Sequence, residues 1–139
     1  MRLSNVAIAG ALALAAGLSG ATAAEADQHK LDEAVRLGTV AALAPLCGFR
    51  EEAWAFDLRR AAIQETTGSA PDDPALEQAP GSNMVVGALS FAEAEALEDF
   101  AQAAPAETCG PLRTSQDLAR ADGMVDRFRA MIRNLKTGS

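Results

Sequence analysis

Residues 114–136 read TSQDLARADGMVDRFRAMIRNLK and give the clearest structural signal in the chain. Apolar side chains recur there at alternating spacings of three and four residues, at Leu118, Ala121, Val125, Phe128, Ile132 and Leu135. That alternation places all six on one face of an α-helix. Thr114 and Asp117 have the spacing of an N-terminal cap. The stretch therefore predicts a capped amphipathic helix with one apolar seam.

Three more helical segments are expected upstream, because Ala, Leu, Glu and Arg favour helix and β-branched residues are sparse. Proline and glycine separate these segments into 27–44, 49–66 and 91–104. Pro45 is expected to end or kink the first, and Pro105 to close the third. Residues 84–89 either extend the third helix backwards or form a short strand, and we favour the helix.

The apolar positions in these segments predict which faces are buried. The first segment has one stripe and is apolar on several sides from Leu37 onward, so its far end should be deeply buried. The second has two opposite apolar faces and should lie between neighbours. In the third, Ser90 and Glu93 have the spacing of a capping box. The stripe of the first segment is Leu31, Val35, Gly38 and Ala42, and the faces of the second are Trp54, Leu58 and Ala61 opposite Phe49, Phe56 and Ile63.

Residues 67–82 form the longest connection and contain three prolines and two glycines. A connection of this length in a compact domain is either functional or mobile. One short turn is expected within it, with Asp73 as the cap and Pro74 at the first helical position.

Cys47 and Cys109 are the only cysteines, and they fall in the first and third connections. In an up-down-up-down bundle those two connections lie at the same end. We therefore expect an all-α fold, a four-helix up-down bundle stapled by one Cys47–Cys109 disulfide. A redox or metal role is the alternative, since a thiol at a helix N-terminus is activated, but the Cys-x-x-Cys spacing of redox catalysts is missing.

Residues 1–24 have the three-part pattern of a secretory signal peptide. Arg2 is the positive start, 6–18 are apolar and 19–24 are small, so we expect cleavage after Ala23 or Ala24. Export would carry the cysteines into an oxidising compartment. Frequent alanine, and ten arginines against two lysines, indicate a GC-rich bacterial genome. Residues 25–137 are then expected to form a single helical domain in the periplasm, or a secreted one.

The chain carries 12 basic and 19 acidic residues, for a net charge of −7. This balance argues against nucleic acid as a partner, and no further apolar run is long enough for membrane insertion. Residues 113–136 alone are basic, with six bases against three acids. They could dock on something acidic, but we expect them to face the acids of their own domain or solvent. The expected partner is a protein of unknown identity.

A search for catalytic and metal-binding patterns finds no complete set. His29 is the only histidine, which excludes a two-histidine metal site or a His–Cys nucleophile pair within one chain. Glu93 and Glu95 alternate with alanine, as expected on a solvated helix. Neither a phosphate-binding glycine loop nor Gly-x-Ser-x-Gly is present. We therefore expect no catalytic residue, cofactor or metal.

Four charged residues of the second segment are the remaining candidates: Arg50, Glu52, Arg59 and Arg60. Glu52 and Arg59 lie on the flank of Phe56, and a helix packed on two sides would partly bury them as an ion pair. The alternative is a patch that faces a partner.

These observations predict a small exported, non-catalytic helical protein that acts by protein–protein binding, as an inhibitor, immunity protein, accessory subunit or chaperone. An acid-stress periplasmic chaperone is the sharper alternative, because the plan of the chain resembles two-cysteine, all-helical periplasmic chaperones of that kind, in plan and not in motif. A cofactor- or carboxylate-dependent enzyme and a structural part of the envelope are the other classes.

Overall fold

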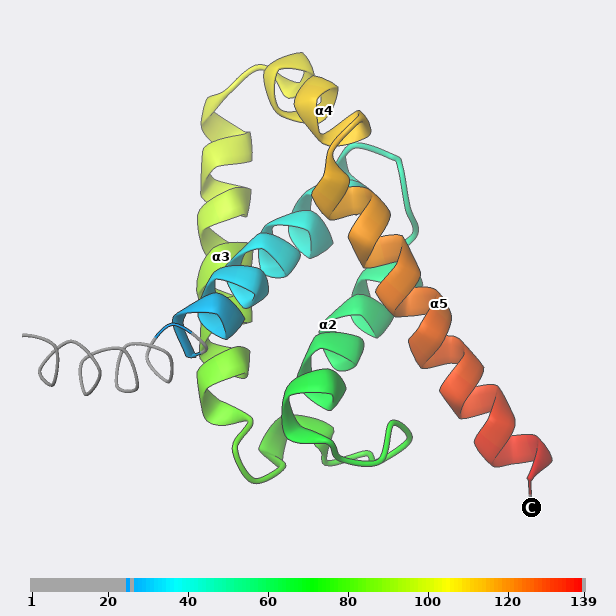
Figure 1. Ribbon diagram of the computed structural model, residues 1–139. Helices are drawn as coiled ribbons and strands as arrows, with labels where there is room; N and C mark the ends of the chain where they lie inside the picture. The colour runs from blue at the N-terminus through cyan, green and yellow to red at the C-terminus, as the bar shows by residue number, and fades with distance from the viewer. Residues whose placement is uncertain (1–24, 26, 139) are drawn as a thin grey trace, which may run out of the picture. The chain divides into compact units, whose positions relative to one another are not determined.

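The N-terminal helix spans residues 27–46 of a computed structural model, which describes residue 25 and residues 27–138 (Figure 1). The predicted signal peptide and both expected cleavage positions lie outside the described residues. The chain divides into two units, Met1–Lys30 and Leu31–Ser139. The described residues of the first unit are helical and exposed. All contacts given below lie within the second.

Four labelled α-helices follow: α2 (Glu52–Thr67), α3 (Asn83–Gln102), α4 (Pro105–Arg113) and α5 (Gln116–Thr137). A short 3-10 helix, η1 (Leu76–Gln78), precedes α3. No strand occurs among the described residues, so the all-α prediction is confirmed and residues 84–89 are helical. The predicted count of four helices is wrong, because the described part of the chain contains five α-helices.

The additional helix is α4, which occupies a segment that proline and glycine marked as a connection. Pro105 stands at its first turn, where proline's fixed φ favours helix and its missing N–H costs nothing. Pro111 lies inside α4 and removes one backbone donor there. Cys109 is therefore a helical residue and not part of a loop.

The end of the N-terminal helix also differs from the prediction. The helix passes through Pro45 to Leu46, and its terminating residue is Gly48, which has a left-handed φ of 73°. The Phe49 N–H donates to the carbonyl of Ala44 (2.9 Å), and the Gly48 N–H donates to that of Pro45 (3.0 Å). These are the two hydrogen bonds of a Schellman motif, so glycine and not proline ends the helix.

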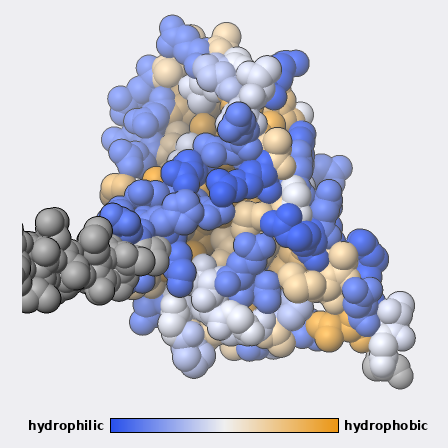
Figure 2. Space-filling view, in the orientation of Figure 1, coloured by the Kyte–Doolittle hydropathy of each residue, from blue (hydrophilic) through white to orange (hydrophobic). Residues whose placement is uncertain are grey.

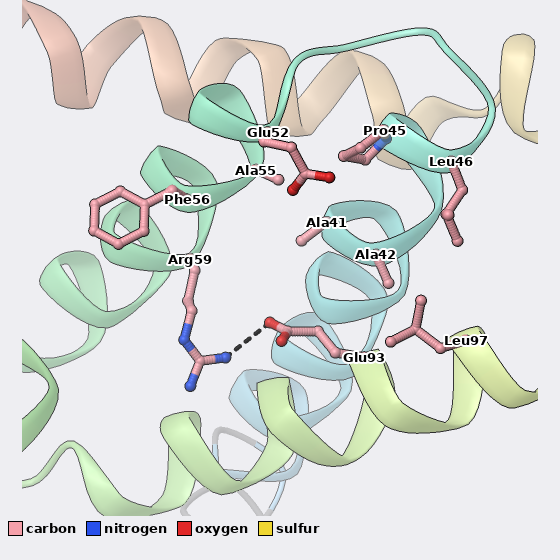
Figure 3. A pocket seen from close by; sticks show the side chains of 10 residues that line it. All are labelled: Ala41, Ala42, Pro45, Leu46, Glu52, Ala55, Phe56, Arg59, Glu93 and Leu97. Carbon is pink, nitrogen blue, oxygen red and sulfur yellow. Dashed lines mark hydrogen bonds and ion pairs between the residues drawn. The ribbon is translucent and has the colours of Figure 1, made fainter.

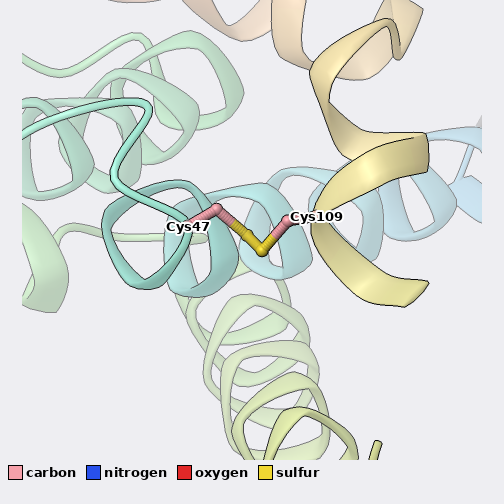
Figure 4. The surroundings of a disulfide bond; sticks show 2 residues. All are labelled: Cys47 and Cys109. Atoms are coloured by element: carbon pink, nitrogen blue, oxygen red, sulfur yellow. A yellow bond between two sulfur atoms is a disulfide. The ribbon is translucent and has the colours of Figure 1, made fainter. Parts of the chain in front are cut away.

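The disulfide prediction is confirmed (Figure 4). Cys47 and Cys109 are bonded, with an S–S distance of 2.03 Å and a Cα–Cα distance of 5.6 Å. Cys47 lies directly after the N-terminal helix, so the bond ties the end of that helix to the middle of α4.

The core lies where α2 packs between α3 and α5. The first four residues of the α5 seam are buried as predicted, whereas Ile132 is half-buried and Leu135 is exposed. Ser115 caps α5 in place of the expected Thr114, and its Oγ accepts from the Asp117 N–H at 3.1 Å. The largest fully buried side chains are Phe128, Leu58, Ile63, Leu76, Leu89 and Val125.

The N-terminal helix crosses α3 at Gly38, a contact that only glycine allows. A Cβ built on Gly38 would lie 2.6 Å from the carbonyl oxygen of Leu89 and 3.0 Å from the Cβ of Ala92. The predicted apolar stripe is only partly buried, since Val35 is exposed. The predicted burial of this helix from Leu37 onward is confirmed for Leu37, Val40, Ala41, Leu43 and Ala44.

Residues 68–82 are held to the helices on both sides. Leu76 of η1 is fully buried in the core. The Arg60 guanidinium donates to the carbonyl of Asp73 (2.6 Å), and Ser82 Oγ donates to that of Glu77 (2.8 Å). Asp73 Oδ1 accepts from the N–H of Ala75 (2.9 Å) as a turn cap, although the 3-10 helix starts at Leu76 and not at Pro74.

Candidate functional site

A groove of about 390 Å³ lies between the end of the N-terminal helix, the first half of α2 and the middle of α3 (Figure 3). Small side chains on two of these helices, Ala41, Ala42 and Ala55, leave the space open. The remaining lining residues are Pro45, Leu46, Glu52, Phe56, Arg59, Glu93 and Leu97. We call the space lined by these ten residues the groove.

Three large apolar side chains of the groove are exposed to solvent. The exposed fractions are 46% for Leu46, 61% for Phe56 and 49% for Leu97. Each comes from a different helix, and in Figure 3 Leu46 and Leu97 lie at one side of the groove and Phe56 at the other. Exposed apolar side chains that converge on one hollow are typical of binding sites, whereas single scattered ones are ordinary.

The exposure of Phe56 differs from the expectation that it belonged to a second buried face of α2. Of that face, Ile63 is fully buried and Phe49 is half-buried. Phe56 instead faces the groove, and the guanidinium of Arg60 lies 5.7 Å from the centre of its ring.

Arg59 fixes one wall of the groove through three side-chain contacts. Its guanidinium donates to Glu77 (2.6 Å), Glu93 (2.8 Å) and Ser90 Oγ (3.0 Å). Burial lowers the pKa of Arg59, but the hydrogen bonds to Glu77 and Glu93 and the negative charges of both together outweigh it, so the net pKa is raised. The guanidinium thus ties α2 to η1 and to α3 as a permanent cation.

The same contacts explain why the predicted capping box is wrong. Ser90 and Glu93 lie in the interior of α3, which begins at Asn83. Their spacing of three residues places both on the helix face that meets Arg59. The three-residue spacing of Ser90 and Glu93 therefore reflects their shared partner Arg59 and not the start of a helix.

Glu52 points into the groove from the first turn of α2 (Figure 3). It is exposed, and no ion pair joins it to any of the described residues. Arg59 pairs with Glu77 and Glu93 rather than with Glu52. The groove therefore offers apolar side chains beside a carboxylate that is open to a cation.

Arg50 belongs to a different cluster, which joins the start of α2 to α5. Its guanidinium donates to both carboxylate oxygens of Asp122, at 2.8 and 2.5 Å, and the Trp54 indole N–H donates to the same carboxylate at 3.0 Å. The hydrogen bonds from Arg50, its positive charge and the bond from Trp54 together hold the pKa of Asp122 below its ordinary value, despite partial burial. The four candidate residues thus lie apart: only Glu52 and Arg59 line the groove, while Arg60 holds the connection after α2.

Sequence reasoning missed Leu46 and Leu97, which supply two of the three apolar contacts. Leu97 follows Glu93 by one turn of α3, so an apolar residue beside the acidic face was the available signal. For Leu46 the expected helix end at Pro45 hid the signal, because the helix continues one residue further.

The described residues contain no group of three His, Cys, Asp or Glu side chains that could hold a metal ion. None of the helices in this part of the chain is long and apolar enough to cross a bilayer. A comparison of the chain with protein-family models, curated proteins and solved structures found no match of any of the three kinds. A proposal for the function must therefore rest on the chemistry of the groove.

Proposed function

We propose that this protein acts by binding, and that its groove takes a protein segment that combines apolar with basic side chains. The observation that carries the proposal is that three exposed apolar side chains, Leu46, Phe56 and Leu97, line one groove that also presents Glu52. Apolar anchors in a pocket supply most of the affinity at protein interfaces, and charges at the rim supply specificity.

The choice of a basic segment rests on charge. Arg59 is the only base lining the groove, and Glu77 and Glu93 already pair with it. Glu52 adds a further negative charge, and the whole chain carries −7. An acidic segment would be repelled, whereas a Lys or Arg beside an apolar anchor would meet Glu52.

A rigid frame supports this proposal, because a preformed groove loses little entropy on binding. The disulfide holds the end of the N-terminal helix, from which Pro45 and Leu46 reach the groove. Arg59 holds α2 to α3. The same disulfide fits an exported protein, and we place the protein in the bacterial periplasm or outside the cell.

Two labelled synthetic peptides test the proposal. One is an amphipathic 18-residue helix of leucine and lysine, and the other has glutamate in place of lysine. We expect the lysine peptide alone to bind, and Phe56→Ser to weaken it at least about tenfold in fluorescence anisotropy. Glu52→Gln should weaken it less and flatten its salt dependence.

Phe91→Ser is the matched control, because Phe91 is 64% exposed but lies outside the groove. It should bind the lysine peptide like the unaltered protein. Equal binding of both peptides, or equal losses in the two phenylalanine variants, would overturn the proposal.

An acid-stress chaperone is a second candidate, and one observation favours it. The ties between helices are arginine–carboxylate pairs, among them Arg50–Asp122, Arg59–Glu93 and Arg129–Asp57. Acid protonates carboxylates and so weakens such pairs. The helices would then separate while the disulfide remains, and their apolar faces would become available to other unfolding proteins.

A further inference from the structure

A second pocket, of about 290 Å³, lies between the N-terminal helix, α4 and the start of α5. It shares no lining residue with the groove. In the space-filling view the N-terminal helix is covered mostly by hydrophilic residues (Figure 2), whereas the second pocket has an apolar wall. Ligand pockets range over roughly 300–1,000 Å³, so this volume suits a small molecule and not a protein segment.

The apolar wall consists of buried aliphatic side chains from two helices. Val40 and Leu43 come from the N-terminal helix and Leu112 comes from α4, and none of the three is more than 8% exposed. Val35, which also lines the pocket, is 39% exposed. The disulfide ties α4 to the end of the N-terminal helix and so keeps the two sides of the pocket together.

Two opposite charges lie side by side in the same pocket. The Arg36 Nε lies 3.8 Å from the Asp117 Oδ1, and the two side chains are 40% and 37% exposed. That distance is too long for a hydrogen bond. Neither side chain forms a hydrogen bond with any of the described residues. An exposed ion pair of this length contributes little to stability, so both groups can bind a ligand at small cost.

Three hydroxyl groups complete the polar part of the second pocket. Thr39 Oγ1 donates to the carbonyl of Val35 (3.0 Å), and Ser115 Oγ accepts from the N–H of Asp117 (3.1 Å). Thr39 can therefore still accept a hydrogen bond, and Ser115 can still donate one. The Thr108 hydroxyl has no hydrogen bond within the described part of the chain and can do either.

We propose that the second pocket binds a free α-amino acid with an aliphatic side chain. The carboxylate of the ligand lies on Arg36, because the planar guanidinium matches a carboxylate with two parallel hydrogen bonds. The ammonium lies on Asp117, and the aliphatic side chain packs against Val40, Leu43 and Leu112. This inference goes beyond the proposed function of the groove and does not depend on it.

The spacing of the two charges selects this class of ligand. An α-amino acid carries its ammonium and its carboxylate on one carbon, so both can meet a pair of protein charges that lie 3.8 Å apart. The four charges then alternate in sign around the contact. A dipeptide holds its two charges further apart, and a lone anion or cation is repelled by one of the two protein groups. A ligand of this size should bind with a dissociation constant on the order of 0.1–1 mM.

An NMR titration of the isotope-labelled exported protein with L-leucine tests the proposal. Leucine should shift the backbone amide signals of residues 35–43 and 108–117 and approach saturation by about 10 mM. Isocaproate has the same side chain and carboxylate but lacks the ammonium, and L-leucinamide keeps the ammonium but lacks the carboxylate. Each should bind at least about tenfold more weakly than leucine. Glycine should also bind more weakly, because it leaves the apolar wall uncovered.

Two variants that remove a charge assign each end of the ligand to its partner. Arg36→Gln should weaken leucine binding about tenfold and should no longer prefer leucine over leucinamide, because the carboxylate has lost its cation. Asp117→Asn should weaken leucine binding about tenfold and should no longer prefer leucine over isocaproate, because the ammonium has lost its anion. Both side chains are partly exposed, so folding should survive, and circular dichroism checks it.

Arg133→Gln and Asp126→Asn are the matched controls, because they remove the same charges at exposed positions of α5 outside the pocket. Both should bind leucine like the unaltered protein. Absence of shifts around the second pocket at about 10 mM leucine overturns the proposal. Equal binding of leucine and its two analogues, shifts confined to the groove, or equal losses in the control variants would also overturn it. The peptide titration of the groove is a separate measurement, so either proposal can fail without the other.

Discussion

Gly38 sets how closely the N-terminal helix approaches α3, and the groove opens further along the same two helices. The nearest atom to an added Cβ would be the carbonyl oxygen of Leu89, which belongs to the helix backbone and cannot rotate away. Any side chain at position 38 would therefore push the two helices apart. Such a shift would move residues 41–46 relative to Leu97 and widen the groove.

Gly38→Ala is expected to lower the free energy of unfolding by about 1–2 kcal/mol, although alanine is favoured over glycine inside a helix by about 1 kcal/mol. Urea unfolding followed by circular dichroism measures the change. Gly87→Ala is the matched control, because Gly87 lies on the exposed side of α3 with nothing within 4 Å of an added Cβ. It should stabilise the protein by about 0.5–1 kcal/mol. A gain in both variants would show that the contact at Gly38 is not tight.

At the scale of single elements, α4 is the least buried helix of the described residues. Leu112 is its one buried side chain, and residues 101–107 are all exposed. The disulfide from Cys109 to Cys47 is therefore a main attachment of α4 to the rest of the domain. Breaking that bond should release α4 before it releases any other helix.

Replacement of both cysteines by serine is expected to lower the free energy of unfolding by about 4 kcal/mol, from the entropy of a loop closed across 62 residues. Amide hydrogen exchange in residues 105–113 should accelerate by more than exchange in residues 118–128, which lie in the buried part of α5. Reduction of the unaltered protein should give the same pattern. Uniform acceleration along the chain would mean that α4 is held by its packing and not by the bond.

Elements were predictable from sequence where one local pattern decides them, and uncertain where two patterns compete. The α5 seam is a single period, so its helix and four buried residues follow from spacing alone. At Pro45 and Gly48 two helix-ending signals stand three residues apart, and only the backbone hydrogen bonds show that the glycine ends the helix. Pro105 was expected only to close the third segment, but α3 ends at Gln102 and Pro105 begins α4, so the proline hid a helix.

The candidate site was less predictable, because it depends on pairs far apart in the chain. Arg59 was recognised as a candidate, but its partners Glu77 and Glu93 lie 18 and 34 residues away. Asp122, which binds Arg50 across 72 residues, had no local feature that set it apart from other acids. Phe56 is exposed at the groove although its seven-residue spacing from Phe49 and Ile63 predicted a buried face, because periodicity does not report which neighbours cover a face.

At the scale of the whole molecule, α5 is joined to its neighbours by charge as well as by its seam. Arg127 and Arg129 of α5 pair with acids of α2, and Asp122 of α5 pairs with Arg50. Arg120 and Asp117 of α5 pair with Glu33 and Arg36 of the N-terminal helix. All of these pairs need an ionised carboxylate, so the attachment of α5 should depend on pH.

The shifted pKa of Asp122 determines whether stability rises or falls with pH. Its pKa in the folded protein is lowered, chiefly by the hydrogen bonds from Arg50, so the folded state holds the charged form more strongly than the unfolded state does. The stability that it contributes is complete above the unfolded pKa of about 3.9 and is lost as the pH falls through the lower folded value. Trp54, the only tryptophan, bonds to this carboxylate and reports on it by fluorescence.

Acid titration of the unaltered protein and of Asp122→Asn therefore tests both the tie and the chaperone alternative. We expect Asp122→Asn to be less stable by about 1 kcal/mol at pH 7 and to lose less stability between about pH 5 and pH 2. Asp126→Asn, at an exposed position of the same helix, should follow the unaltered protein. A hydrophobic dye should bind the unaltered protein increasingly below about pH 4 while its helical circular dichroism persists, because α5 loosens and the disulfide stays. Parallel stability curves for all three proteins would remove Asp122 as the sensor, and dye binding that stays flat from about pH 7 to pH 2 would exclude acid release of apolar surface, and with it the chaperone.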